Sequence, residues 1–228
     1  MMAENFHIVV EGKEDMCFLV GYLGHLFPGE VLSSSVSFRI LYGINKLGGQ
    51  VQNIREKLIR PPRGTRILIF PDADKEGYAD KKKEVERILR SNWSDNENME
   101  EFERILGVRL HLFLFPNNKS SGILEDLLKK IILPRHRDVF TCFDGYVKCL
   151  TRSKGGYDPP DIKAKIYAYK HALKILNKLH DDTRKTYSYE KAHGMLKGKN
   201  PFDPQHWDFD NSALEPLKKF LTKHIPGQ

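Results

Sequence analysis

Residues 6–15, Phe6-His-Ile-Val-Val-Glu11-Gly12-Lys-Glu-Asp15, run from a short apolar segment directly into a group of acids. Residues 67–74, Ile67-Leu-Ile-Phe-Pro-Asp72-Ala-Asp74, repeat this order. Short and nearly continuous apolar runs are typical of strands that are covered on both faces of a parallel sheet. In such sheets, ligands and metals bind at the carboxyl ends of the strands. We therefore expect the acids of both stretches to converge at one end of a sheet.

The rest of the first half alternates strand and helix patterns. Apolar runs at Val36–Leu41 and Val108–Phe115 are further strand candidates. Helical spacing of apolar residues follows Asp15, recurs over residues 51–59 and returns after Gly77. Repeated strand-helix-strand units with right-handed crossovers predict a doubly wound α/β domain over residues 1–133.

The second half has a different pattern, because strand signals fade after Pro134. Helical patterns cover residues 138–150, 160–179 and 214–225, which predicts a helical extension over residues 134–228 that packs on the α/β domain. Residues 187–204 carry two glycines and two prolines among several lysines. That composition indicates a basic, loosely structured connector.

Composition and charge restrict the classes of function. The chain has 228 residues and a formal net charge of +7, although several of its acids belong to the expected cluster. A basic surface around an acidic pocket suits a polyanionic substrate held near a metal. The alternative is that the positive charge serves solubility.

The cysteines and histidines argue against a disulfide framework and against a zinc site. The three cysteines are odd in number and lack zinc-ligand spacing, and the nine histidines form no compact cluster. Oxygen-bound cations fit the acids better. We see no secretory signal and no apolar stretch long enough to span a membrane, so we expect a cytoplasmic protein.

Each acid also has a structural interpretation. Glu11 and Asp15 are four residues apart, which places them on one edge of a first helical turn, but acids there also complement the helix dipole. Pro71 cannot donate to a strand ladder, so pairing should stop before Asp72 and Asp74, which could then cap a turn or a helix. Glu11 ends a strand before any helix begins. Glu11, Asp72 and Asp74 together therefore favour a metal site.

A strand, Glu-Gly, a helix, and a later strand followed by Asp-x-Asp resemble the TOPRIM family of topoisomerases, bacterial primases and several nucleases. This resemblance covers roughly residues 5–90. Phe115-Pro-Asn-Asn118, then Gly122-Ile-Leu-Glu125-Asp126, and the tail from Trp207 to Leu221 are similar to the overcoming-lysogenisation-defect (OLD) nuclease branch and its small relatives.

The resemblance implies a metal-dependent nuclease that holds one or two Mg²⁺ or Mn²⁺ ions. The implied metal ligands are Glu11, Asp15, Asp72, Asp74 and Glu125, although first-turn stabilisation of a helix also explains Glu125. A lysine beyond the sheet would neutralise charge on the phosphate. Lys165 is the candidate, with Lys163 as an equal choice and an exposed position on an amphipathic helix as the alternative. The implied catalytic residues are Glu11, Asp72, Asp74 and Lys165.

Nucleic acid, DNA or RNA, is the expected partner. The cations that we expect to contact phosphates are Lys13, Lys81, Lys82, Arg135, Arg137 and Lys197. Larger OLD-branch proteins carry an ATPase domain, but this chain has no Gly-x-x-x-x-Gly-Lys-Ser/Thr loop. The resemblance therefore implies a separate ATPase partner and an effector role in antiphage defence, and a homodimer is a candidate assembly.

Two other interpretations remain open. A non-catalytic nucleic-acid-binding or regulatory subunit would keep the same fold, although a degenerate site should have lost one of the acids. An aspartate-nucleophile phosphatase also has Asp-x-Asp after an apolar strand. That family normally has Thr or Val where this chain has Glu76, and it would leave Glu11 unexplained.

Overall fold

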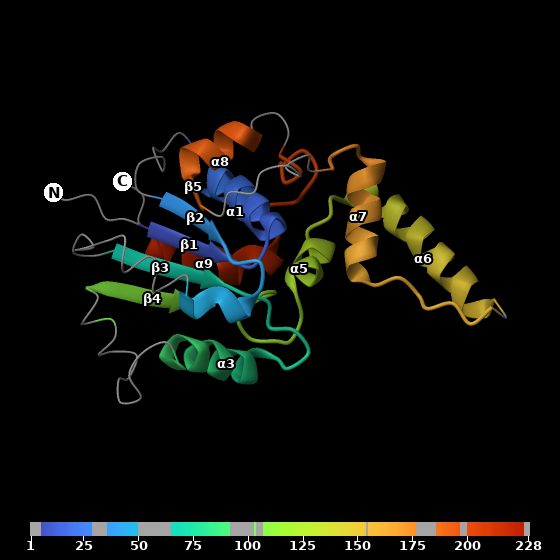
Figure 1. The fold of residues 1–228 in the computed structure, drawn as a ribbon. Coiled ribbons are helices and arrows are strands. Elements are labelled where there is room, and N and C mark those ends of the chain that lie inside the picture. The colour runs from blue at the N-terminus through green and yellow to red at the C-terminus, as the bar shows by residue number, and fades with distance from the viewer. Residues whose placement is uncertain are drawn as a thin grey trace.

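A computed structural model shows an α/β fold in which one sheet is covered by helices (Figure 1). The structure describes residues 6–28, 36–49, 65–91, 103, 107–153, 155–176, 186–196 and 200–225. The helix expected over residues 51–59 therefore lies outside the described residues. Among the described helices, none has the length and apolar character needed to cross a bilayer.

The sheet has five strands in the order β4-β3-β1-β2-β5. Strand β1 pairs in parallel with β2 and with β3, and β3 pairs in parallel with β4, whereas β5 runs antiparallel to β2. The strands span Phe6–Val10 (β1), Val36–Ile40 (β2), Thr65–Phe70 (β3), Val108–Leu112 (β4) and Thr186–Ser188 (β5). The predicted α/β class is thus confirmed, and so are the four strands expected in the first half.

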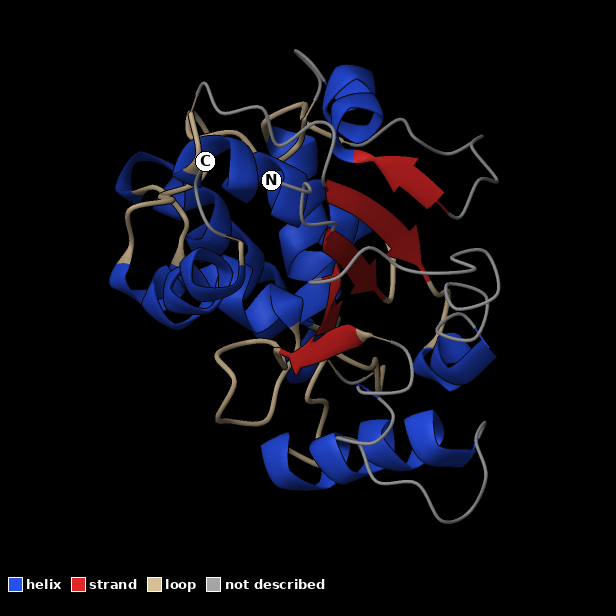
Figure 2. Cartoon of the chain, turned by 90° about the vertical axis from the view of Figure 1, so that its left-hand side faces the viewer, coloured by secondary structure: helices blue, strands red, loops and turns tan. Residues whose placement is uncertain are grey.

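Helices cover both faces of the sheet, as the nearly continuous apolar strands predicted (Figures 1 and 2). Ile8 and Val10 of β1 point into one core with α1, while Val9 points into a second core with Val85 of α3. Because successive side chains of a strand alternate between faces, a strand buried on both faces must be apolar throughout. The α-helices span Lys13–Leu26 (α1), Tyr78–Ser91 (α3), Leu124–Lys130 (α5), Arg137–Arg152 (α6), Ile162–Ala172 (α7), Tyr189–Leu196 (α8) and Glu215–His224 (α9).

The C-terminal half contains a strand that the helical patterns did not predict. Residues 186–188 form the strand β5, and residues 189–196 form α8, which packs against α1. The expected loose connector over residues 187–204 is therefore wrong for residues 187–196, whereas residues 200–204 form neither helix nor strand. Tyr187 and Tyr189 bury their rings against the core. Tertiary packing therefore orders a segment whose composition predicted a loop.

The other C-terminal helices occupy two different places. Helices α6 and α7 form a pair that projects from the body beyond α5 (Figure 1), and α6 buries none of its residues. Helix α9 lies against the sheet, where the Phe220 ring meets Phe70 and Phe113 at centroid distances of 5.6 and 5.3 Å. After residue 200 the chain therefore packs against the core of the α/β domain.

Gly21 shows how closely this returning segment approaches α1. A Cβ at Gly21 would lie 2.2 Å from the carbonyl oxygen of Phe202, which is backbone and cannot move aside. We expect Gly21→Ala to lower the free energy of unfolding by about 2–3 kcal/mol, as overpacking does. Urea unfolding followed by circular dichroism would measure this change.

Gly145 supplies the matched control, because it lies inside α6 and a Cβ there would meet no atom within 4 Å. Gly145→Ala should raise the free energy of unfolding by about 0.5–1 kcal/mol, since alanine favours a helix interior. Equal effects of the two substitutions would contradict the close approach of residue 202 to α1.

Candidate functional site

The acids identified in the sequence meet at the carboxyl ends of β1 and β3. Glu11 directly follows β1, and Asp72 and Asp74 follow β3 after Pro71. The charge of Asp72 acts on Asp15, and the charges of Glu11 and Glu125 act on both aspartates. The structure therefore brings together the five expected metal ligands, here called the acid cluster: Glu11, Asp15, Asp72, Asp74 and Glu125.

Strand pairing was expected to stop at Pro71, but it continues on the side of the segment after β4. The Pro71 carbonyl accepts a hydrogen bond of 2.9 Å from the Phe115 N–H, and the Ala73 N–H donates to the Phe115 carbonyl at 3.0 Å. Proline lacks an N–H but keeps its carbonyl, so it can still accept such a bond. These bonds hold the segment of Asp72 and Asp74 against the segment after β4.

Two of the acids accept backbone N–H groups, and a third accepts from a lysine side chain. The Asp15 carboxylate accepts the Gly12 N–H at 2.8 Å, so it caps α1. The Asp72 carboxylate accepts the Leu124 N–H at 2.8 Å at the start of α5. Asp74, at a positive φ of 50°, accepts from the Lys81 ammonium at 2.8 Å. These acids therefore make structural contacts and also belong to the acid cluster.

Four members of the acid cluster have a raised pKa, and burial is the first cause for each: Glu11, Asp15, Asp72 and Glu125. Burial is the main cause for Asp72, and Glu11, Glu125 and Asp74 add to it, so that its pKa rises to about 7. Burial followed by the charge of Asp72 raises the pKa of Asp15 well above its usual value. Burial also raises the pKa of Glu11 and of Glu125. Such shifts favour a proton or a cation between the carboxylates.

Glu11 has a buried oxygen that lacks a partner. Its Oε1 atom is shielded from solvent and has no hydrogen bond, although Lys81 and a backbone hydrogen bond from Asp72 favour its ionised form. A buried carboxylate oxygen is costly unless a donor or a cation satisfies it. The oxygen donors of the acid cluster suit Mg²⁺ or Mn²⁺. In the described part of the chain, however, no three acidic, histidine or cysteine side chains are arranged to hold one ion.

The structure distinguishes between the two candidate lysines. The Lys165 ammonium binds the Asp144 carboxylate of α6 and lies 4.5 Å from the centre of the Phe140 ring. Lys163 instead contributes positive charge at Glu11 and at Glu125. Lys163 is therefore the lysine of this pair that acts on the acid cluster, while Lys165 joins α7 to α6.

Lys170 is a further residue near the acids that the sequence did not point to. Its ammonium binds the Glu14 carboxylate, and its charge also acts on Glu125. It lies seven residues after Lys163 on α7, which is the helical spacing of one face. The sequence spacing of Lys163 and Lys170 could have identified Lys170 if the side of α7 that faces the acids had been known.

The expected phosphate-contacting cations have different environments. Lys81 is buried, with 7% of its side chain exposed, and pairs with Asp74 and with Glu84, so it is a partner of the acid cluster and not a surface contact. Lys13 is half-buried, and Lys197 lies outside the described residues. Three of these cations are exposed: Lys82, Arg135 and Arg137.

The pKa of Asp72 predicts how stability depends on pH. Because this pKa rises from 3.8 to about 7, the folded protein binds more protons than the unfolded chain between these values. The contribution of Asp72 to stability should therefore fall as pH rises through this window. Asp72→Asn keeps an oxygen acceptor for the Leu124 N–H but cannot ionise. Between pH 5 and pH 7 the free energy of unfolding of this variant should therefore fall less than that of the wild type.

Urea unfolding at pH 5 and pH 7 in metal-free buffer would measure this difference. Asp80→Asn is the matched control, because Asp80 is an exposed acid in the first turn of α3. It should keep the pH dependence of the wild type. An identical pH dependence in Asp72→Asn and in the wild type would contradict the raised pKa.

Comparison with known proteins adds a family without a known activity. A family model described as a protein of unknown function, DUF3226, matches residues 5–225. No curated protein and no solved structure matches the chain.

Proposed function

The chain belongs to the DUF3226 family of unknown function, and we propose that it is a metal-dependent nuclease that hydrolyses phosphodiester bonds of DNA or RNA. The observation that carries this proposal is the buried, unpartnered Oε1 atom of Glu11 among four further acids. A divalent cation would satisfy that oxygen and would offset the burial and the repulsion that raise the pKa of Asp72 and Asp15.

Glu11, Asp72 and Asp74 are the proposed metal ligands closest to the strand ends, with Asp15 and Glu125 beside them. A bound Mg²⁺ or Mn²⁺ ion would neutralise phosphate charge and lower the pKa of bound water. Binding requires side chains of the acid cluster to rotate, because their present arrangement does not surround one point. Asp74 would then share its carboxylate between the ion and Lys81.

The lysines around the acid cluster have a separate role in the proposal. Lys163 and Lys81 supply positive charge at Glu11. A phosphodiester that approaches the acids would otherwise be repelled by them, and fixed cations reduce that repulsion. We therefore propose Lys163, in place of Lys165, as the lysine that neutralises phosphate charge. The net charge of +7 favours a polyanionic substrate in the same way.

Specific contacts favour one alternative, a nucleic-acid-binding or regulatory subunit that cleaves nothing. Asp15, Asp72 and Asp74 already have partners in Gly12, Leu124 and Lys81, so part of the acid cluster has a structural task. In such a subunit burial would favour the protonated form of Glu11, and no metal would bind there. The resemblance to the OLD branch motivates the remaining proposals: a cytoplasmic defence effector that works with a separate ATPase.

Metal binding is tested first by thermal unfolding with Mn²⁺, Mg²⁺ or chelator. An ion at 100 times its dissociation constant stabilises the native state by about 2.7 kcal/mol, which corresponds to roughly 5–10 °C for a chain of this size. Asp72→Ala should abolish this shift, and Asp80→Ala should retain it. A shift that persists in Asp72→Ala would place the ion elsewhere.

Cleavage is tested with plasmid, single-stranded DNA and transfer RNA under the same metal conditions. Cutting that requires the metal and disappears in Asp72→Ala would support the nuclease and identify its substrate class. Metal binding without cutting of any substrate, also after addition of a cell extract with ATP, would favour the non-catalytic alternative.

A further inference from the structure

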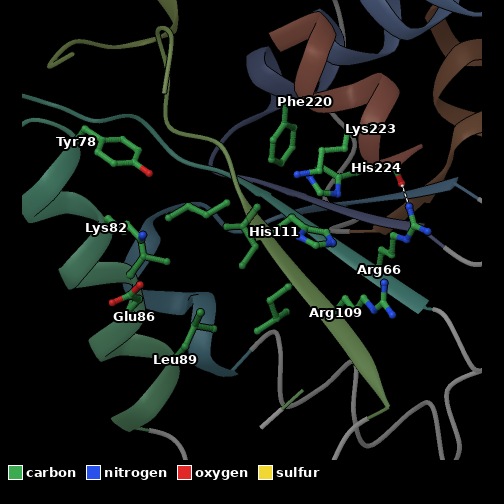
Figure 3. Close-up of a pocket in the computed structure, with 14 residues that line it drawn as sticks. Arg66, Tyr78, Lys82, Glu86, Leu89, Arg109, His111, Phe220, Lys223 and His224 are labelled. Carbon is green, nitrogen blue, oxygen red and sulfur yellow. Dashed lines mark hydrogen bonds between the residues drawn. The ribbon is translucent and has the colours of Figure 1, made fainter. Parts of the chain in front are cut away.

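A cavity of about 550 Å³ lies beside the edge strand of the sheet (Figure 3). The edge strand β4 crosses it, with α3 on one side and the end of α9 on the other. We call this cavity the β4 pocket. The side toward α3 is mainly apolar, with Val85, Leu89 and Leu112, while the other side carries Arg66, Arg109 and Lys223.

Positive charge dominates the β4 pocket. Its lining includes two arginines and two lysines, while Glu86 contributes the carboxylate among the lining residues. The Arg66 guanidinium is held in position, because it donates to the His224 carbonyl at 2.8 Å and lies 5.7 Å from the centre of the Phe6 ring. A guanidinium that is already positioned loses little freedom when it binds an anion.

Two stacked histidines lie among these cations. The rings of His111 and His224 have centroids 3.8 Å apart. Burial, then His224, Arg66, Arg109 and Lys223 lower the pKa of His111 from 6.5 to about 4. Burial followed by Lys223 and Arg66 also lowers the pKa of His224. Burial and the nearby positive charges therefore both favour the neutral form of these rings, and neutral rings still offer N–H donors.

We propose that the β4 pocket binds a phosphate-bearing ligand through Arg66, Arg109 and Lys223. Arginine forks match phosphate oxygens in two-point contacts, and the histidine N–H groups add further donors. The volume of the cavity lies in the range of pockets that hold small ligands, which suits one nucleotide-sized group. The apolar side toward α3 would receive the less polar part of that group.

The cationic side of the β4 pocket and the acid cluster lie toward opposite ends of β3. Arg66 is the second residue of β3, and Asp72 follows the strand's carboxyl end. Six residues of extended chain span about 20 Å. The proposal therefore does not rest on nuclease activity, and metal-free binding experiments test it separately from cleavage.

Inorganic pyrophosphate in metal-free buffer is the first probe, because the acid cluster repels it when no cation is present. Titration calorimetry measures its affinity, and NMR follows the imidazole signals of His111 and His224 as pH changes. Bound pyrophosphate should raise the pKa of His111 from about 4 toward 6.5, since an anion offsets the nearby cations. Histidine signals that do not respond to pyrophosphate would overturn the proposal.

Arg109→Gln combined with Lys223→Gln should weaken pyrophosphate binding at least tenfold. Both side chains are exposed, so the fold should persist, and circular dichroism checks that it does. Lys83→Gln is the control, because Lys83 is an exposed lysine of α3 outside the pocket, and it should change the affinity less than twofold. Unchanged binding in the double variant, or equal losses in the control, would overturn the proposal.

ATP and a single-stranded oligonucleotide distinguish the two sources of phosphate. If the double variant loses affinity for ATP and not for the oligonucleotide, the ligand is a free nucleotide. If it loses affinity for the oligonucleotide as well, the β4 pocket binds the phosphodiester backbone. Retained affinity for all three probes would show that the cavity binds no phosphate.

Discussion

Glu11→Gln is expected to slow metal-dependent cleavage about a thousandfold while nucleic-acid binding changes less than about threefold. A metal-bound phosphate gains several kcal/mol of transition-state stabilisation, and a loss of about 4 kcal/mol corresponds to roughly three powers of ten in rate. Glutamine keeps the size of the side chain but removes the charge that would hold the ion. Cleavage rates with Mn²⁺ and binding measured in chelator separate the two effects.

The same variant should not lose stability when metal is absent. Glu11 is half-buried, burial raises its pKa and its Oε1 atom has no hydrogen-bond partner, so the ionised form of this side chain opposes folding. Without a metal, the free energy of unfolding of Glu11→Gln should equal or exceed that of the wild type. Loss of activity without loss of stability distinguishes a ligand from a structural residue.

Glu190→Gln is the control, because it makes the same substitution and the same change of charge at an exposed acid in the first turn of α8. It should retain the wild-type rate. Asp74→Asn is expected to abolish cleavage as Glu11→Gln does. Full activity in a variant that carries both Glu11→Gln and Asp74→Asn would sink the assignment of the acid cluster.

Trp207→Ala is expected to lower the free energy of unfolding by about 3–5 kcal/mol, the usual cost of removing a fully buried aromatic ring. The Trp207 indole is buried, and its N–H donates to the Pro201 carbonyl at 2.7 Å. Its ring meets Tyr169 of α7 at 5.0 Å and Phe202 at 5.4 Å, measured between centroids. Trp207 thus connects the returning C-terminal segment to α7 and the core.

Urea unfolding measured by circular dichroism gives this loss directly. Trp207→Phe should cost less, because it keeps most of the apolar volume and removes mainly the hydrogen bond. Tyr146→Ala is the surface control, with a side chain that is 54% exposed on α6, and it should change stability by about 0.5 kcal/mol or less. A loss in Trp207→Ala as small as in Tyr146→Ala would show that the segment around Trp207 contributes little to the core.

Local patterns were enough to predict the strands and the place of the acids. The run Phe6–Val10 is apolar at every position but His7, and the structure makes it a strand with these bounds. A parallel sheet brings the ends of β1 and β3 together whatever lies between them, so Glu11 and Asp72 could be placed near each other from sequence. The bounds of β3 and β4 differ from prediction by a few residues, as expected where strands fray into irregular pairing.

The sequence also indicated two alternative roles for some residues, but it could not decide between those roles. Asp15 was either a ligand or a first-turn acid, and its bond to the Gly12 N–H shows that it caps α1 while facing the other acids. Lys163 and Lys165 lie two residues apart on one helix, on different faces. Only the packing of α7 against α5 and α6 could decide which lysine turns toward Glu125.

The sequence by itself determined the α/β alternation and the buried strands, because these follow from the spacing of neighbouring residues. The parallel sheet that they predict then places Glu11, Asp72 and Asp74 at one end. The tertiary structure alone decided that β5 joins β2, that Lys81 is buried against Asp74 and that Arg66 meets His224. The contacts of β5 with β2 and of Arg66 with His224 join residues more than 140 positions apart. No local periodicity encodes such pairs, since they exist only when the packed core brings distant segments together.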